Sequence, residues 1–368
     1  MSLELGAQEI PDHPRDWVVA LEGYLSQNGV ACDKATPIHG GISCFLWRLD
    51  GLKDAEASSN GHQEGEAVVM KCADSMAKMA PVPVAADRMQ VEIKALGSNA
   101  VAEACRQEPA VQVPRVLRKT KNGFIMSWAG EVDLLSAYKD KTKYSSSLDV
   151  GAIGTHLGNW LACLHLAGMD DEDGWGSLHN EDVAKYGDRE EYVIRTAMGK
   201  TDYSSEQVEG VLRTLRKPGR MQTLTPWDFR PMNTLLRMKE GEGDAAVHDL
   251  TIVDWEFCHY GEPSNDLRLW VAEAMVLEVK HGERGLLSSF LKAYKDKAGA
   301  VIIDEDFVCK VAVAVGTFLL LFMPAKIWDC TEEDREPWTE TAIQYVKAGA
   351  ERNMAWLSQS VLKPLLDR

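Results

Sequence analysis

Three polar residues near the middle of the chain have the types and spacing of a phosphoryl-transfer site. Asp228 is followed five residues later by Asn233, and the apolar segment 251–253 leads directly into Asp254. One carboxylate can accept the proton of an attacking hydroxyl, while an amide oxygen and a second carboxylate bind Mg²⁺ that bridges nucleotide phosphates. Each piece alone is also typical of a turn beside a strand, because Asp and Asn favour turns. The ordered set favours the chemical interpretation.

A lysine inside an apolar segment is the second candidate. Lys71 lies in the segment 67–73, which has the pattern of a short strand, and a buried ammonium group needs an anionic partner. Glu92 is the candidate partner, since Arg88, Glu92 and Leu96 follow one another at the spacing of one helix face. The alternative is an edge strand with Lys71 in water and Glu92 on a solvated face. If the lysine is buried, we expect Lys71 to contact the phosphates of a nucleotide and Glu92 to hold the lysine in place.

A glycine turn precedes the lysine strand. Gly40, Gly41 and Ser43 lie about 30 residues before Lys71, where backbone N–H groups and a hydroxyl could meet the phosphates of a nucleotide. Glycine turns of this kind are common in hairpins, so the position of the turn carries more weight than its composition.

The segment 124–130 joins the two halves of the chain. A strand that connects two lobes exposes backbone groups that can bind an adenine edge. We expect the Ser127 carbonyl and the Ala129 amide to do so, with Met126 lining the pocket.

These residues require a particular set of elements to position them. Strand patterns and one long helix pattern fill residues 36–127, and mostly helical patterns follow. We therefore predict an α+β fold with two lobes. Residues 1–128 form a small nucleotide-binding lobe with an antiparallel sheet and one key helix, 129–132 form a hinge, and 133–368 form a larger helical lobe. The polar stretch 50–66 is predicted to be a surface insertion, a loop or a partly disordered segment.

The composition excludes several classes of partner. The 368-residue chain has a formal net charge of −16, which argues against nucleic acid or an anionic membrane as its partner. The acidity would suit a cationic acceptor, but a solvated acidic surface explains it equally well. The longest apolar run, 311–324, is shorter than the ~20 residues of a membrane span, and residues 1–16 lack the apolar core of a signal peptide. The eight cysteines include no C-x-x-C pair, so we expect a cytoplasmic protein.

The ordered motifs resemble those of the aminoglycoside phosphotransferase and choline kinase superfamily, which has a protein-kinase-like fold. Residues 157–165, L-G-N-W-L-A-C-L-H, are similar to the family's L-G-x-x-L-A-x-L-H helix. Residues 254–267, D-W-E-F-C-H-Y-G-E-P-S-N-D-L, are similar to the choline kinase and methylthioribose kinase branch, and to hydroxytryptamine kinases. The resemblance covers residues from about 36 to 330.

This resemblance implies a small-molecule kinase. It implies Asp228 as the catalytic aspartate and Asn233 and Asp254 as Mg²⁺ ligands. The nucleotide would be ATP, and its γ-phosphate would pass to a hydroxyl of a small metabolite of the amino alcohol, sugar or phenol type. The residues it implies at the nucleotide are Lys71, Glu92, Ser127 and Ala129. His165 and Asp266 match positions that are mostly structural in the family.

The catalytic loop departs from the family pattern. The family has H-G-D, whereas Pro226 and Trp227 precede Asp228 here. Proline cannot make the hydrogen bonds with which the histidine braces the loop, and tryptophan is much bulkier than glycine. Arg230 could stabilise charge on a transferring phosphoryl group. An alternative function follows from these departures: a nucleotide-binding pseudokinase that acts as a sensor or scaffold.

The acceptor side is less specific. Aromatic and acidic side chains near Asp228 would favour a cationic or aromatic alcohol, although most tryptophans of a helical lobe pack in its core. The candidate acceptor residues are Trp227, Arg230, Glu256, Trp270 and Trp328, with Glu273 among the acids in their neighbourhood. The apolar positions of the last helix suit a monomer as well as a homodimer.

Overall fold

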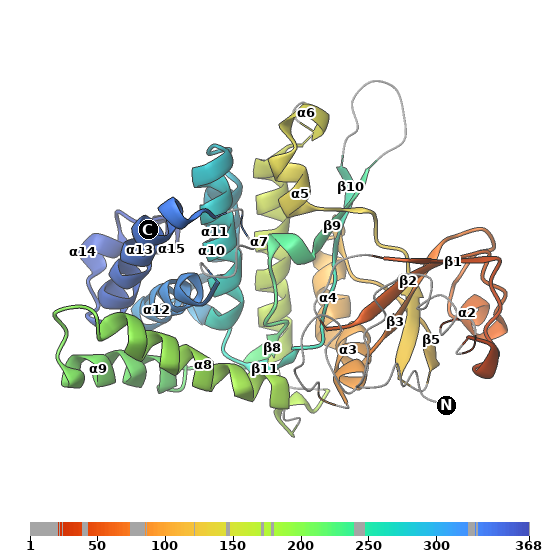
Figure 1. Ribbon diagram of the computed structural model, residues 1–368, viewed down its shortest axis with the longest axis horizontal. Coiled ribbons are helices and arrows are strands. Elements are labelled where there is room, and N and C mark those ends of the chain that lie inside the picture. Colours follow the sequence, from red (N-terminus) through yellow and green to blue (C-terminus); the bar gives the residue numbers. More distant parts are fainter. Residues whose placement is uncertain are drawn as a thin grey trace. The chain divides into compact units, whose positions relative to one another are not determined.

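The computed structural model describes residues 21, 23, 25–38, 43–73, 85, 87–120, 122–144, 148–170, 173–177, 180–238, 247–322, 328 and 330–367. The chain forms two compact units, whose elements are labelled in Figure 1. Unit 1 contains the described residues up to Ser98, together with Val113–Ala129 and Trp255–Phe257. Unit 2 contains Asn99–Gln112, Gly130–Asp254 and the residues from Cys258 onward.

Unit 1 is built on a five-stranded antiparallel sheet with the strand order β1-β2-β3-β6-β5. Its strands are β1 (Lys34–Pro37), β2 (Phe45–Asp50), β3 (Val68–Cys72), β5 (Val116–Thr120) and β6 (Gly123–Ser127). Its helices are α2 (Ala55–Ser59) and α3 (Arg88–Leu96). The antiparallel sheet and the helix after it agree with the α+β class predicted for the chain.

Side chains of the central strand β3 alternate between two apolar clusters. Val68, Met70 and Cys72 belong to one cluster, whereas Val69 belongs to the other, together with residues of α3. Because successive side chains of a strand point to opposite faces, Lys71 lies on the same face as Val69. The lysine is therefore directed to the side of the sheet on which α3 packs.

The segment 50–66 contains a short helix anchored to the core, which corrects the prediction of a loop or partly disordered segment, although most of its side chains are exposed. Helix α2 begins after Asp54, whose side chain caps the helix by accepting a hydrogen bond from the Ala57 amide. Asp54 also pairs with Arg118 of β5. Leu52 and Ala57 are enclosed in the core of unit 1. A few apolar contacts and one buried ion pair thus fix a segment whose composition is otherwise polar.

We expect Ala57→Asp to lower the free energy of unfolding by about 2 to 4 kcal/mol, because it places an unpaired carboxylate in the core. Ala55→Asp is the matched control, since Ala55 is exposed in the first turn of the same helix, where a carboxylate is favourable. Chemical denaturation followed by circular dichroism measures both variants. Equal stability of the two would contradict the packed position of α2.

The division of the chain differs from the predicted boundaries. Helix α4 (Asn99–Gln107) and strand β4 (Val111–Gln112) belong to unit 2. The reason is packing: α4 lies against α7 (Val150–Ala167), and β4 pairs in parallel with β10 (Val247–Ile252). A contiguous division at residue 128 misses these contacts because they join residues far apart in the sequence.

Unit 2 is mostly helical, with two small sheets of strand order β4-β10-β9-β7 and β11-β8. Its other strands are β7 (Val132–Asp133), β8 (Thr223–Thr225), β9 (Thr234–Met238) and β11 (His259–Gly261). Its other helices are α5 (Leu134–Lys139), α6 (Lys141–Tyr144), α8 (Glu181–Met198), α9 (Ser205–Arg216), α10 (Ser264–His281), α11 (Leu286–Ile302), α12 (Glu305–Phe322), α13 (Glu332–Ala350), α14 (Met354–Leu357) and α15 (Lys363–Leu366), with 3-10 turns η1 (Gly168–Asp170), η2 (Trp175–Ser177) and η3 (Pro231–Asn233).

Close helix packing forms the core of unit 2. Helix α7 packs along α11, and two glycines of α7 permit the approach. A Cβ atom on Gly154 would lie 2.4 Å from the Leu286 carbonyl oxygen, and one on Gly158 would lie 2.3 Å from that of Phe290.

Among the residues that the structure describes, we find no helix with the length and apolar content needed to cross a membrane.

Candidate active site

A β-hairpin in unit 2 brings the Asn and the second Asp of the candidate site together. Strands β9 and β10 pair in antiparallel register, with Thr234 opposite Ile252. The pairing continues one residue further, where the Val253 amide donates to the Asn233 carbonyl oxygen at 3.0 Å. Asp254 follows Val253 directly. The register therefore explains why residues about 20 positions apart in sequence leave the same end of one hairpin.

Asn233 also closes the loop that carries Asp228. Its side-chain Nδ2 donates to the Asp228 carbonyl oxygen at 3.0 Å and to Asp228 Oδ2 at 2.8 Å. The Asp228 side chain is 22% exposed. A substrate can therefore reach it. With Nδ2 directed at the loop, the Asn233 amide presents its oxygen for other contacts. That oxygen and the Asp254 carboxylate are the hard oxygen donors that Mg²⁺ prefers, so the residues fit the implied metal.

Trp227 adopts a backbone conformation that glycine would adopt without strain. Its φ of 67° lies in the left-handed region, which is costly for a bulky residue. The conformation is held by the backbone N–H of Trp227, which donates to Asp266 Oδ1 at 2.6 Å. Its ring is 5% exposed, lies 4.1 Å from the Arg268 guanidinium carbon and meets Tyr186 edge-on. Trp227 thus packs beneath the loop.

A buried polar network supports the same loop in place of a histidine at position 226. Asp266 Oδ2 is hydrogen-bonded to His165 Nε2 at 2.8 Å, and His165 Nδ1 is hydrogen-bonded to the Tyr294 hydroxyl at 2.8 Å. Burial raises the pKa of Tyr294 well above its usual range, and the Asp266 charge adds to this effect. Asp266 therefore braces the catalytic loop from α10, which suits the structural role implied for His165 and Asp266.

The lysine of unit 1 is fully enclosed in an ionic cluster. Lys71 Nζ lies 2.7 Å from Glu92 Oε2 and 2.6 Å from Glu256 Oε2, and the lysine side chain is 1% exposed. Strand β3 is flanked by β2 and β6, so the alternative of an edge strand with Lys71 in water does not hold. The Lys71–Glu92 pair therefore forms as the helix spacing predicts.

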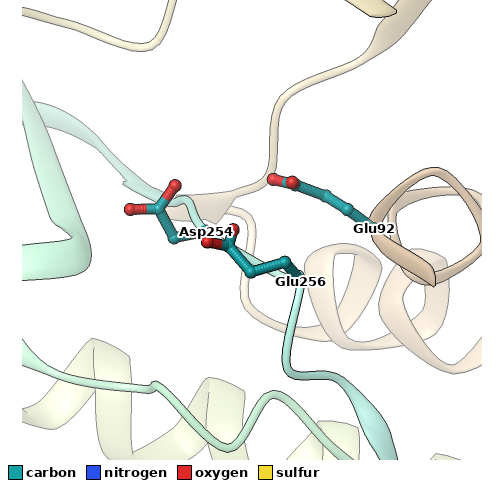
Figure 2. Close-up of side chains that lie close together, drawn as sticks. All are labelled: Glu92, Asp254 and Glu256. Atoms are coloured by element: carbon teal, nitrogen blue, oxygen red, sulfur yellow. The ribbon is translucent and has the colours of Figure 1, made fainter. Parts of the chain in front are cut away.

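Glu256 belongs to this cluster, although the sequence placed it among the acceptor candidates. Figure 2 shows it near Glu92, with Asp254 two residues earlier in the chain. Arg88 Nη1 lies 3.7 Å from Glu256 Oε1, and the adjacent Trp255 amide donates to Glu92 Oε1 at 3.3 Å. The cluster thus contains two cations and two carboxylates.

A buried thiol lies beside the same carboxylate. Cys44 Sγ is 4.0 Å from Glu256 Oε1. Burial, and next the Glu256 charge, raise the pKa of Cys44 well above its usual range. The thiol therefore stays protonated and unreactive.

Several of the residues that were predicted to bind the nucleotide lie in described segments of unit 1. Met126 and Ala129 are buried, each 6% exposed, and Ser127 and Ser43 are partly exposed. The Ser127 hydroxyl accepts a hydrogen bond from the Arg115 amide at 2.9 Å. Gly40 and Gly41 lie outside the described residues.

The remaining acceptor candidates of unit 2 are well buried. Trp270 has no exposed surface and packs against Phe229 and Phe290. An enclosed ring offers no surface to an acceptor, which corrects that prediction. Trp328 is 2% exposed, and Arg230 is 7% exposed; both side chains are bound to Glu273.

Sequence reasoning missed the roles of several contributors to these arrangements. Arg88 shares a helix face with Glu92, and that spacing could have indicated it. Tyr186 of α8 lies against Trp227, and Arg268 covers the same ring. For Tyr186 and Arg268 no motif or spacing gave a signal, because their positions depend on tertiary packing.

No protein-family model matches the chain. A curated relative, 4-hydroxytryptamine kinase from Psilocybe cyanescens, is 22% identical over 352 residues, covering 90% of this chain and 93% of the relative. A macrolide 2′-phosphotransferase from Brachybacterium faecium has a TM-score of 0.48 at 15% identity, covering 88% of this chain and 97% of that one. Ethanolamine kinase from Plasmodium vivax has a TM-score of 0.44 at 10% identity, covering 92% and 96%. The sequence of the chain is similar to that of a small-molecule kinase, in agreement with the resemblance of its motifs.

Proposed function

We propose that the chain is a kinase that transfers the γ-phosphate of ATP to a hydroxyl of a small molecule, with Mg²⁺ as cofactor. The observation that carries the proposal is the closed loop of unit 2, in which Asn233 joins Asp228 to the strand end that precedes Asp254. This arrangement gives one exposed carboxylate and a neighbouring pair of oxygen donors. Those are the protein groups that phosphoryl transfer requires, since positioning and charge stabilisation supply most of its catalysis.

Each residue then has a defined part in the reaction. Asp228 orients the acceptor hydroxyl and takes its proton as the oxygen attacks the γ-phosphorus, while the bond from that phosphorus to the bridging oxygen breaks and ADP leaves. Asn233 and Asp254 would hold Mg²⁺, which would neutralise charge at the phosphates when bound. Lys71 is enclosed by Glu92 and Glu256, so its contact with the phosphates requires that Glu256 release the ammonium group when the nucleotide binds, while Glu92 continues to hold it. Arg88 keeps a second positive charge within the same cluster of unit 1.

The acceptor class is proposed from chemistry and from the curated relative. That relative is a 4-hydroxytryptamine kinase, which favours a hydroxylated aromatic amine over a sugar as the acceptor of this chain. The formal net charge of −16 is compatible with a cationic acceptor. A panel of 4-hydroxytryptamine, ethanolamine, an aminoglycoside and a macrolide, with ATP consumption as the readout, compares the classes directly.

We expect ATP with Mg²⁺ to stabilise the protein against thermal unfolding. A nucleotide at about 100 times its dissociation constant adds about 2.7 kcal/mol to the free energy of unfolding. EDTA should remove most of the shift, and GTP tests the choice of base. No shift with any nucleotide would contradict the proposed function.

The alternative of a nucleotide-binding pseudokinase rests on Pro226 and on the strained backbone of Trp227. It predicts the same thermal shift without phosphate transfer to any member of the acceptor panel. The two measurements together therefore separate a kinase, a nucleotide sensor and a protein that binds no nucleotide.

A further inference from the structure

We propose that Glu273 is a positioning residue, which sets the geometry of the Asp228 loop by holding Arg230 and the backbone of Met232. The proposal rests on the proposed kinase activity for its catalytic consequence. The contact itself can be tested without turnover.

Glu273 is the meeting point of donors from two different segments. Glu273 Oε1 accepts from Arg230 Nη2 at 2.7 Å and from Trp328 Nε1 at 2.7 Å. Glu273 Oε2 accepts from Arg230 Nε at 3.2 Å and from the Met232 amide at 3.2 Å. The carboxylate is therefore bound on both oxygens, by a forked guanidinium and by two neutral N–H groups.

Because this pair is buried, removing one of its charges is costly. Glu273 is 0% exposed, and Arg230 is 7% exposed. Burial by itself lowers the pKa of Arg230, but the Glu273 and Asp228 charges outweigh it, so the pKa of the guanidinium is raised. The guanidinium therefore remains charged, and removal of the Glu273 carboxylate leaves it without this partner in a low-dielectric site.

The loop geometry links this pair to the catalytic groups. Arg230 and Met232 lie between Asp228 and Asn233 in the sequence. Helix α10 thus holds the middle of the loop through Glu273, while Asn233 ties its end back to Asp228. Arg230 Nη1 also lies 3.9 Å from Asp228 Oδ1. A displaced Arg230 would therefore move, or pair with, the carboxylate that receives the acceptor proton.

A positioning role has a kinetic consequence that a purely structural role lacks. We expect Glu273→Gln to lower kcat by about 100-fold, because misplacement of catalytic groups by about 1 Å costs a factor of this size. The KM for ATP should stay within about threefold of the wild-type value, since the loop change acts on the transition state. Glu273→Asp, which keeps the charge, should recover part of the rate.

The contact can be observed directly through Met232. In protein labelled with ¹³C at the methionine methyl groups, the Met232 signal, assigned with Met232→Leu, should shift or broaden in Glu273→Gln. The signal of Met70, which is enclosed in the core of unit 1, should not change. Glu262→Gln is the matched control, because Glu262 also accepts from a backbone amide and a cation, Gly219 and Lys310, outside the catalytic loop.

Each of the following results supports or overturns the positioning role of Glu273. A kcat for Glu273→Gln within about threefold of wild type, or a lower kcat with an unmoved Met232 signal, overturns the positioning role. If Glu273→Gln does not fold, Arg230→Lys, which keeps the charge and loses the fork, is judged by the same two readouts. A wild-type protein without turnover would defeat the proposed function, while the Met232 signal would still decide whether Glu273 holds the loop.

Discussion

Replacement of Asp228 by asparagine should abolish phosphotransfer while nucleotide binding persists. Asparagine preserves the size of the side chain and one oxygen that can accept the hydrogen bond now made by Asn233 Nδ2. It cannot take a proton from the acceptor hydroxyl. Loss of general-base assistance costs about 100- to 10,000-fold in rate. Initial rates with the best acceptor of the panel, and thermal shifts with ATP and Mg²⁺, measure the two properties separately.

A distant aspartate provides the control for this experiment. Asp202 is largely exposed and pairs with Lys347 at 3.0 Å, so Asp202→Asn should keep the wild-type rate. Unchanged turnover of Asp228→Asn would refute its role as the base. A loss of the nucleotide-dependent shift in the same variant would instead indicate that Asp228 belongs to the Mg²⁺ site.

The local parts of the site could be predicted from the sequence. The Lys71–Glu92 pair follows from two local patterns, a lysine within an apolar strand and the helix face that carries Glu92. The strand that leads into Asp254 follows from the apolar segment before it. Its pairing with the strand after Asn233 was not predicted and comes from the structure.

Residues whose roles depend on tertiary packing could not be assigned in this way. Glu256 is two residues from Asp254, an obvious motif position, yet its partner Lys71 lies 185 positions away in the sequence. The polar segment around α2 misled the prediction because only a few of its residues are buried. Composition averages over a segment, whereas packing depends on individual positions such as Ala57.

Trp227 shows how a bulky residue can adopt a strained backbone. A left-handed conformation, which glycine adopts without cost, is combined here with a large side chain. Its amide contact with Asp266 and its ring contacts with Arg268 and Tyr186 oppose the strain. The loop therefore keeps Asp228 and Asn233 in contact with Pro226 and Trp227 before the aspartate.

Replacement of Lys71 by methionine should have the largest effect on stability. Methionine fills a similar volume, but it removes from the buried cluster the ammonium group that contacts both Glu92 and Glu256. Loss of one partner from a buried ion pair costs about 3 to 5 kcal/mol. Urea denaturation measures this loss. The stabilisation by ATP with Mg²⁺ should also disappear, because the proposed phosphate contact is removed.

A charge-balanced double variant separates these two effects. Lys71→Met combined with Glu92→Gln removes one charge of each sign, so it should recover much of the lost stability without restoring nucleotide binding. Lys53→Met is the control, since Lys53 pairs with Asp33 at an exposed position, and it should leave both properties nearly unchanged. A stable Lys71→Met protein with a normal ATP response would show that the cluster neither supports the fold of unit 1 nor binds the nucleotide. Recovery of both stability and the ATP response in the double variant would show that Lys71 matters only as a counter-charge, and the phosphate contact would have to be assigned to Arg88.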